Sequence, residues 1–279
     1  MTHMKSETNF MNDNTANLTT TPVRALMFGC GNMGQALISG WKKADGIDFT
    51  VVDPAGPDLE GVDVHASMDS LEGEFGLIII AVKPQMIADV MSAAKHLVDP
   101  AGLVLSIAAG TSVKTLQGIL GDKAIVRMMP NMPASVKLGL SGLLANEQCG
   151  DVEKSLIEKM ASENGEFLWL DSEDKLDRFT AIAGSGPGYV FEIMRLFQTA
   201  AMTLGFTEEE ARLLSVNTVY GSAGMAAENP KPLEELREAV TSKKGVTLAG
   251  LQQLMADDVL AGLLNRTVES AYNRAVELR

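Results

Sequence analysis

Cysteine and histidine are scarce in this chain of 279 residues, and the few that occur are scattered. The two cysteines, Cys30 and Cys149, have neither the spacing of a metal motif nor the number needed for a disulfide framework. The three histidines, His3, His65 and His96, form no cluster, so we predict neither a metal site nor a histidine-based catalytic triad. So few cysteines are typical of a reducing compartment, and we expect a cytoplasmic protein.

Long apolar runs and clustered positive charge are also missing. The longest apolar run, residues 77–82, has the length of a strand, whereas a membrane-spanning helix needs about 18 to 20 apolar residues. The net charge of −13 argues against a nucleic-acid partner, because phosphate binding requires clustered lysines and arginines. We therefore expect neither a membrane nor a nucleic-acid partner. Residues 1–21 are polar, aperiodic and without the apolar core of a signal peptide, so we expect a disordered tail there.

The first folded segment has the order strand, glycine-rich turn, helix. An apolar run at residues 24–28 precedes the turn Gly29-Cys30-Gly31-Asn32-Met33-Gly34, and a helical pattern continues to Trp41. In the dinucleotide-binding fingerprint, the first glycine permits a tight turn, the second lets the backbone approach the pyrophosphate, and the third lets the helix pack close to the strand. We therefore predict that all six residues of the turn contribute to a dinucleotide site.

A second predicted strand, residues 49–53, ends in Asp53, 22 residues after Gly31. An acid in this position usually accepts hydrogen bonds from the adenosine ribose hydroxyls. The same carboxylate would repel the 2′-phosphate of NADPH, and no lysine or arginine follows it before Lys83. Asp53 therefore favours NADH over NADPH. The preference is weakened if Lys42 and Lys43 lie nearby, since an exposed like-charge contact costs only about 1 kcal/mol.

Strands and helices alternate up to residue 171, which predicts an α/β domain with a Rossmann-like doubly wound sheet over residues 22–171. Further strands are expected at 76–82, 102–107, 124–127, 142–145 and 166–170. Ligands bind outside the carboxyl ends of parallel strands, so the glycine-rich turn and the loops at 81–84, 108–110 and 129–133 should surround one cleft. The residues expected to meet the cofactor from these loops are Ala81, Val82, Lys83, Pro84 and Asn131.

After Asp171 no strand-like run occurs, and residues 172–279 are expected to form a separate all-α domain. Several of its segments are apolar on more than one face, for example residues 200–204 and 223–227, which indicates a subunit interface. We therefore expect a homodimer. The predicted helices are 175–183, 187–204, 208–228, 232–240, 247–257 and 259–277.

Residues 237–254 place hydroxyl groups next to a predicted helix start. Thr241, Ser242 and Thr247 surround Gly245, and leucines then recur at helical spacing. The free N–H groups at a helix start, together with hydroxyls, form a receptor for an anion such as a carboxylate. We predict that Thr247 is the N-cap of this helix and that it reaches a polar atom of the substrate.

The composition of the helical half favours an imine over a ketone as hydride acceptor. Reducing a ketone needs a proton shuttle, usually His, Tyr or Lys. The helical half has no histidine, no lysine between Lys175 and Lys231, and only Tyr189 as a phenol near the start of its long helix. A protonated C=N group is already electrophilic, so a carboxylate pocket and a hydroxyl suffice, and these requirements point to Ser242 and Thr247.

From Val23 onward the chain resembles the pyrroline-5-carboxylate reductase family. The resemblance rests on six motifs in the family's order and spacing, at residues 28–34, 81–84, 106–110, 127–134, 184–191 and 240–247. It implies NAD(P)H-dependent reduction of L-Δ1-pyrroline-5-carboxylate to L-proline, the last step of proline biosynthesis. It also implies a helical dimerisation domain whose dimers interlock and often form decamers. The active site would lie between the cofactor domain of one subunit and helices that can come from both.

The same resemblance assigns the last motif to the substrate. It implies that Ser242, Gly245, Val246 and Thr247 bind substrate, with Ser242 and Thr247 as the catalytic residues. The family's usual proline and glycine are replaced here by Lys243 and Lys244.

A second departure is Gly188, where alanine is usual in the family. Many members of the family also prefer NADPH, which Asp53 opposes here.

Two alternative functions stay open at the level of sequence. A 3-hydroxyacid dehydrogenase of the hydroxyisobutyrate type shares the two-domain plan, but the missing helical lysine argues against it. A non-catalytic NAD(P)-sensing protein is the other alternative, because the loop at 242–247 departs from the family motif.

Overall fold

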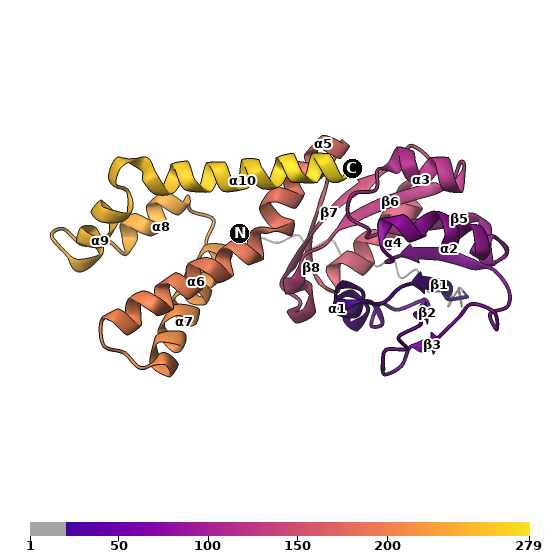
Figure 1. The fold of residues 1–279 in the computed structure, drawn as a ribbon, viewed down its shortest axis with the longest axis horizontal. Helices are drawn as coiled ribbons and strands as arrows, with labels where there is room; N and C mark the ends of the chain where they lie inside the picture. Colours follow the sequence, from indigo (N-terminus) through magenta and orange to yellow (C-terminus); the bar gives the residue numbers. More distant parts are fainter. Residues whose placement is uncertain (1–20) are drawn as a thin grey trace, which may run out of the picture.

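The computed structural model describes residues 21–279, so all but the last residue of the tail expected at 1–21 lies outside the described residues. The first part of the chain forms an eight-stranded sheet (Figure 1). The strand order is β3-β2-β1-β4-β5-β6-β7-β8, and only the β6–β7 pair is antiparallel. The strands are β1 (Val23–Phe28), β2 (Ile47–Val52), β3 (Asp63–His65), β4 (Phe75–Ile80), β5 (Val98–Ser106), β6 (Ala124–Met129), β7 (Gly139–Ala145) and β8 (Gly165–Trp169).

Helices cover both faces of the sheet. Helices α1 (Asn32–Trp41) and α4 (Asp151–Ser162) pack on one face, and α2 (Ile87–Ala93) and α3 (Val113–Leu120) pack on the other. Successive residues of the central strands point to opposite layers, so neighbouring positions such as 27 and 28 belong to different apolar clusters. Burial on both faces explains why these strands are continuous apolar runs. The predicted Rossmann-like class is confirmed.

Two elements of the sheet domain were not predicted, the edge strand β3 and the helix α4. Strand β3 has only three residues, Asp-Val-His, and one apolar residue between two polar ones gives no periodic signal. It forms because its backbone pairs in parallel with β2, with His65 beside Val52. This short strand widens the sheet beyond β2, at the edge nearer the glycine-rich turn.

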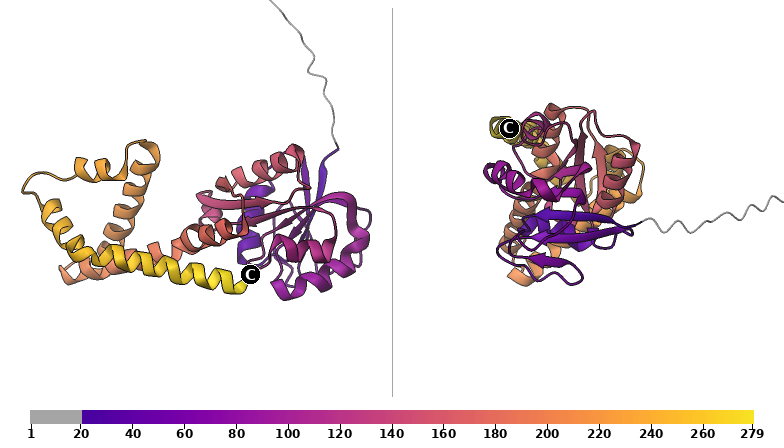
Figure 2. Two further views of the ribbon diagram at one scale, coloured as in Figure 1. Left: turned by 90° about the horizontal axis from the view of Figure 1, so that it is seen from above. Right: turned by 90° about the vertical axis from the view of Figure 1, so that its right-hand side faces the viewer.

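From Glu173 onward the chain is helical, as predicted, and it extends away from the sheet (Figures 1 and 2). Helices α6 and α7 form one arm, while α8 and α9 lead into the long α10, whose last turn returns to the sheet domain. Helix α5 passes directly into a π-helical turn, Thr180–Gly184. The helices are α5 (Glu173–Phe179), α6 (Gly186–Thr203), α7 (Glu208–Glu228), α8 (Leu233–Ala239), α9 (Val246–Leu254) and α10 (Val259–Leu278).

The two arms bury very few of their own side chains. Helices α6, α8, α9 and α10 contain no buried residue, and α7 contains only Ala211 and Ser215. Large apolar side chains remain uncovered, including Phe191 at 65%, Phe197 at 52% and Leu263 at 52% exposure. Contiguous apolar surface of this kind marks a protein interface, which supports the expected homodimer. Within residues 21–279, no helix has the length and apolar character needed to cross a membrane.

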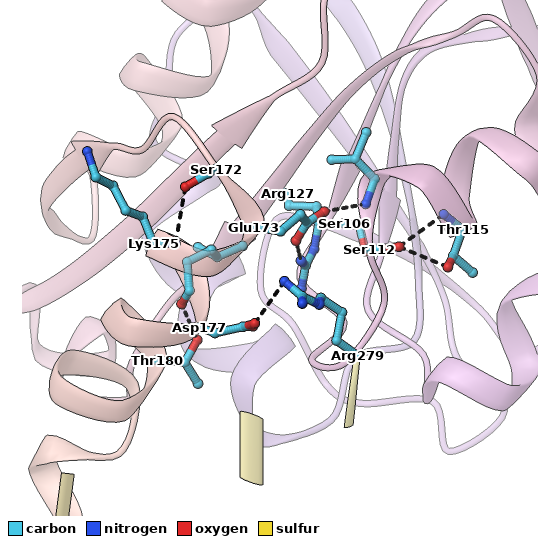
Figure 3. A network of polar contacts seen from close by, with 12 residues as sticks. Ser106, Ser112, Thr115, Arg127, Ser172, Glu173, Lys175, Asp177, Thr180 and Arg279 are labelled. Atoms are coloured by element: carbon cyan, nitrogen blue, oxygen red, sulfur yellow. Dashed lines mark hydrogen bonds and ion pairs between the residues drawn. The ribbon is translucent and has the colours of Figure 1, made fainter. Parts of the chain in front are cut away.

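A network of polar contacts joins the helical half to the sheet (Figure 3). Glu173, the first residue of α5, accepts a hydrogen bond of 2.6 Å from the N–H of Val113 and pairs with the buried Arg127 of β6. Beside it, a guanidinium nitrogen of Arg279 lies 3.1 Å from the buried carboxylate of Asp177. Burial raises the pKa of Asp177, and the charge of Arg279 opposes that shift. Helix α5 is therefore fixed both to the sheet and to the end of α10.

Replacing Phe197 or Leu263 by glutamate should convert the homodimer into monomers, because either change places a charge in the apolar surface of the arms. Light scattering after size exclusion should then give about the 29.7 kDa chain mass rather than the larger mass of the wild-type assembly. Val152→Glu is the matched control, because Val152 is 80% exposed on α4, away from the arms. If both arm variants kept the wild-type mass, the proposed interface would be wrong.

Candidate functional site

The glycine-rich turn lies where the strand order reverses, with β1 between β2 and β4. Gly29 follows β1 with φ at 84°, and a Cβ there would come within 2.9 Å of the carbonyl oxygen of Ala81. Only glycine allows this approach of the turn to the loop after β4. At Gly31 a Cβ would meet no atom within 4 Å, so the space above it is open. Gly31 is also the N-cap of α1 and has no side chain to occupy the N–H groups there, which leaves them for an anion.

Asp53 follows β2 and is tied to the glycine-rich turn. One carboxylate oxygen accepts a hydrogen bond of 2.6 Å from the N–H of Cys30, and the other accepts one of 2.8 Å from the N–H of Ala55. Each oxygen of a carboxylate has two lone pairs, so both can still accept a hydrogen bond from a ribose hydroxyl. The geometry therefore fits the role predicted for this acid.

Two cavities adjoin this turn and share Gly31, Ala81, Val82 and Lys83. The larger, of about 540 Å³, is lined by Asp53, the loop after β3 and apolar side chains of the loop after β4. The smaller, of about 310 Å³, lies between the turn and residues 81–84 and 107–109, and includes Asn32, Met33, Gly34 and Pro84. Both cavities, which we together call the groove, adjoin the carboxyl ends of the parallel strands, where a dinucleotide binds in such folds.

Sequence reasoning missed the outer wall of the larger cavity, which consists of residues 66–69. This loop follows β3, and without that strand no signal placed it near the turn. The only hint was position, since the loop lies between two predicted strands of the same sheet.

Two predicted residues have structural roles that the sequence did not indicate. Cys30 is buried, and burial together with the charge of Asp53 raises the pKa of its thiol to about 11. Asn131 is 7% exposed and lines neither cavity. Its side chain accepts a hydrogen bond from the N–H of Leu140 and donates one to the carbonyl of Ala183, both of 3.0 Å. Asn131 thus links the loop after β6 to the π-helical turn, and its contact with a cofactor stays a prediction.

The predicted N-cap of α9 was wrong, because the helix begins at Val246 and Thr247 already lies in its first turn. The N-cap is Gly245, in an extended conformation with φ −83° and ψ 173°, and no side chain caps the helix. A Cβ on Gly245 would overlap the hydroxyl oxygen of Ser242, so glycine lets this hydroxyl lie against the helix start. Ser242 and Thr247 are both exposed beside the uncapped N–H groups.

Lys244 precedes this helix in a left-handed conformation, with φ at 60°. That conformation costs a non-glycine residue roughly 1–2 kcal/mol. The family motif described above has glycine at this position, and glycine adopts this conformation without that cost. Lys243 and Lys244 are both exposed.

The two parts of the predicted site lie far apart within one chain. Figures 1 and 2 place α8 and α9 at the outer end of the helical arms and α1 in the sheet domain at the other end. The structure thus brings together the predicted cofactor residues other than Asn131, and separately the predicted substrate residues. One chain alone does not bring the two groups together.

A dinucleotide groove on a Rossmann-like sheet, followed by helices with an open apolar surface, defines a dimeric class of nicotinamide-dependent oxidoreductase. Comparison with known proteins makes the class specific. Residues 173–278 match the family model for pyrroline-5-carboxylate reductase dimerisation. The pyrroline-5-carboxylate reductase of Pseudomonas aeruginosa is 34% identical over 265 residues, which cover 91% of this chain and 96% of that protein. The chain belongs to the pyrroline-5-carboxylate reductase family.

Solved structures agree with this assignment. A pyrroline-5-carboxylate reductase from Coxiella burnetii superposes with a TM-score of 0.82 at 33% identity, covering 93% of this chain and 99% of that one. A Plasmodium falciparum pyrroline carboxylate reductase, solved with NADP bound, has a TM-score of 0.80 at 24% identity, covering 92% and 98%. The second likeness shows a shared fold that includes both halves of the chain.

Replacing Gly31 by alanine should weaken dinucleotide binding at least tenfold with little change in thermal stability. A Cβ at this position meets no protein atom but projects into the open space of the groove. Binding is measured by nicotinamide fluorescence titration, and stability by the melting temperature. Gly118→Ala, in α3 and equally free of contacts, is the control and should bind normally. Normal affinity in the Gly31 variant would place the pyrophosphate elsewhere.

Proposed function

We infer that the protein is a pyrroline-5-carboxylate reductase that uses NAD(P)H to reduce L-Δ1-pyrroline-5-carboxylate to L-proline, the last step of proline biosynthesis. The observation that carries this inference is the 34% identity to a pyrroline-5-carboxylate reductase over 91% of this chain. The groove at the glycine-rich turn and the hydroxyl-lined start of α9 supply the two binding functions that the reaction needs.

The residues around the groove would hold the reduced dinucleotide in a defined orientation. Its pyrophosphate would lie over Gly31 and the N-terminus of α1, and its ribose would donate hydrogen bonds to Asp53. The nicotinamide end would then reach the smaller cavity, beside Ala81–Pro84 and residues 107–109. The bound dinucleotide supplies a hydride from its dihydronicotinamide ring.

The start of α9 would hold the substrate. The uncapped N–H groups of this helix and the hydroxyl of Ser242 would bind the carboxylate, and Thr247 would hydrogen-bond the ring nitrogen. A C–H bond forms at C5 of the protonated imine, while the electrons of the C=N π bond move to the nitrogen, which becomes the amine of proline. Positioning and stabilisation of the positive charge account for the rate, so the scarcity of acid–base side chains poses no obstacle.

The distance between the two binding regions within one chain requires a second subunit. We propose that α9 of one chain faces the cofactor groove of its partner, brought there when the apolar arms of two chains interlock. Residues 22–171 would form the dinucleotide-binding domain and residues 172–279 the dimerisation and substrate domain. Further assembly into a decamer of five dimers is the expected final state. The two free, buried cysteines are in keeping with a cytoplasmic location.

Purified protein should oxidise reduced nicotinamide dinucleotide only when pyrroline-5-carboxylate is added, and proline should form in equal amount. Absorbance at the dihydronicotinamide band follows the first change, and chromatography with amino-acid detection follows the second. Oxidised dinucleotide with hydroxyisobutyrate is the control and should give no turnover. Activity with the hydroxyacid alone, or dinucleotide binding without any imine turnover, would exclude the proposed reaction.

Thr247→Ala should lower kcat roughly ten- to hundredfold, since a hydrogen bond to a charged group contributes about 1.5–3 kcal/mol. Dinucleotide affinity should not change, because Thr247 lies outside the groove. Steady-state kinetics and fluorescence titration separate the two effects. Thr203→Ala, whose hydroxyl only donates to the carbonyl of Thr199 in α6, is the control. Equal kcat values for the Thr247 variant and the control would remove Thr247 from the mechanism.

A further inference from the structure

The outer wall of the larger cavity begins directly beside Asp53. The backbone N–H of Asp53 donates a hydrogen bond of 3.0 Å to the carbonyl of His65, the last residue of β3. The next four residues, 66–69, then line the cavity on the side opposite the loop after β4. Asp69 closes this wall, and the hydroxyl of Ser67 holds its carboxylate with a hydrogen bond of 2.9 Å. The adenosine end of the groove is therefore lined by two carboxylates, Asp53 and Asp69.

We propose that Asp53 and Asp69 together make this groove selective for NADH, and that Asp69 is a second specificity residue that acts by excluding the 2′-phosphate of NADPH. The proposal rests on the function proposed above, since it names the coenzyme of that same site. It follows from the two carboxylates that line the cavity and from the positions of Lys42, Arg24 and Lys83.

Lys42 and Arg24 contact residues 53–74, but each donates to backbone carbonyls that do not line the larger cavity. The ammonium of Lys42 donates to the carbonyl of Glu60 at 2.6 Å, so it does not reach the groove. Arg24 donates to the carbonyls of Glu72 and Glu74. The Nε2 atom of His65 lies 2.8 Å from a carboxylate oxygen of Asp63, so this ring nitrogen is occupied as well. Neither Lys42 nor Lys43 lines either cavity, so the compensating charge considered from the sequence is not supplied.

Lys83 is the one lysine that lines the larger cavity within the described chain, and it also lines the smaller one. It therefore lies where the two cavities meet, which is the expected position of the pyrophosphate shared by both coenzymes. Residues 53–74 contain seven acids, no lysine and no arginine. A 2′-phosphate would thus enter a region of uncompensated negative charge.

Asp53 and Asp69 should contribute unequally to the preference for NADH over NADPH. Asp53 is partly buried and fixed by two N–H groups, and it can accept hydrogen bonds from ribose hydroxyls. A phosphate dianion at the 2′ position has no proton to donate, so NADPH would lose that bond and meet repulsion as well. Asp69 is exposed, so salt screens its charge and its effect is purely repulsive. Asp53 should therefore supply most of the preference for NADH, and Asp69 should add a smaller contribution that decreases with salt.

The test is a set of direct binding titrations on the full chain without substrate. NADH and NADPH are titrated by nicotinamide fluorescence into the wild type and into Asp53→Asn, Asp69→Asn and Asp58→Asn, each at low and at high salt. Asp58→Asn is the matched control, because it removes the same charge from the same segment at an exposed position that lines neither cavity. A competition pair, 5′-AMP against 2′,5′-ADP, isolates the added phosphate from the rest of the coenzyme.

We expect the wild type to bind NADH at least tenfold more tightly than NADPH, and 5′-AMP more tightly than 2′,5′-ADP. Asp53→Asn should reduce the preference to within about threefold, mainly by tightening NADPH. Asp69→Asn should reduce it two- to threefold at low salt and less at high salt, while Asp58→Asn leaves it unchanged. Equal or tighter binding of NADPH by the wild type would overturn the proposal. An Asp69 variant that matches the Asp58 control would remove Asp69 from it.

These outcomes are independent of catalysis. If the NADH preference were found but pyrroline-5-carboxylate were not reduced with either coenzyme, the proposed reaction would fail and the coenzyme selectivity would stand. If the imine were reduced equally well with both coenzymes and the titrations showed no preference, the selectivity would fail and the reaction would stand.

Discussion

Helices α6 to α10 cannot cover their own apolar side chains, and this constraint determines where a complete site can form. An isolated helical hairpin with so little buried surface gains too little to offset the ordering of its chain. The arms are therefore stable only against another surface of the same kind. Because the hydroxyl-lined start of α9 is carried on these arms, a partner that covers them would, in the proposed arrangement, also bring substrate to a cofactor groove. Folding, association and catalysis would then depend on burial of the same apolar surface.

The joint between the halves must then be rigid, because it sets where each arm points. Glu173 binds the start of α3 and Arg127 of β6 at once, and Asn131 holds the carbonyl of Ala183 in the π-helical turn. Phe179 packs where β7 has Gly142, a position at which a Cβ would come within 2.7 Å of its ring. The ion pair of Glu173, the amide hydrogen bond of Asn131 and the aromatic contact of Phe179 all fix α5 or the π-helical turn that follows it. The arms therefore leave the sheet domain in a defined direction.

Sequence patterns predicted the sheet domain well wherever the pattern was strong. A strand buried on both faces needs a continuous apolar run, such as the one before Ala81, and a tight turn needs glycines. Both signals can be seen in the local sequence, and together they indicated where the groove lies. Strand β3 was not predicted, because its three residues form a strand only by pairing with β2. Without β3 in the predicted sheet, Ser67 and Asp69 could not be placed at the cavity, since their position depends on that pairing.

The start of α9 shows the same limit in another form. Thr247 has the residue type of an N-cap, yet the helix begins at Val246 and its N-cap is Gly245, which lies against the Ser242 hydroxyl. Asn131 was predicted to meet the cofactor because it is polar and follows a strand. Both of its hydrogen bonds, however, run to protein backbone. A sequence reveals which atoms can bond, whereas the choice among partners is made by the tertiary fold.

The thiol of Cys30 gives the dinucleotide turn a chemical property of its own. With a pKa of about 11 it remains protonated at physiological pH, and its burial keeps reagents away. Only a thiolate reacts readily with peroxides and electrophiles. The Cys30 thiol is therefore a poor target for peroxides and electrophiles, in contrast to the exposed, acidic thiols of redox-sensitive proteins.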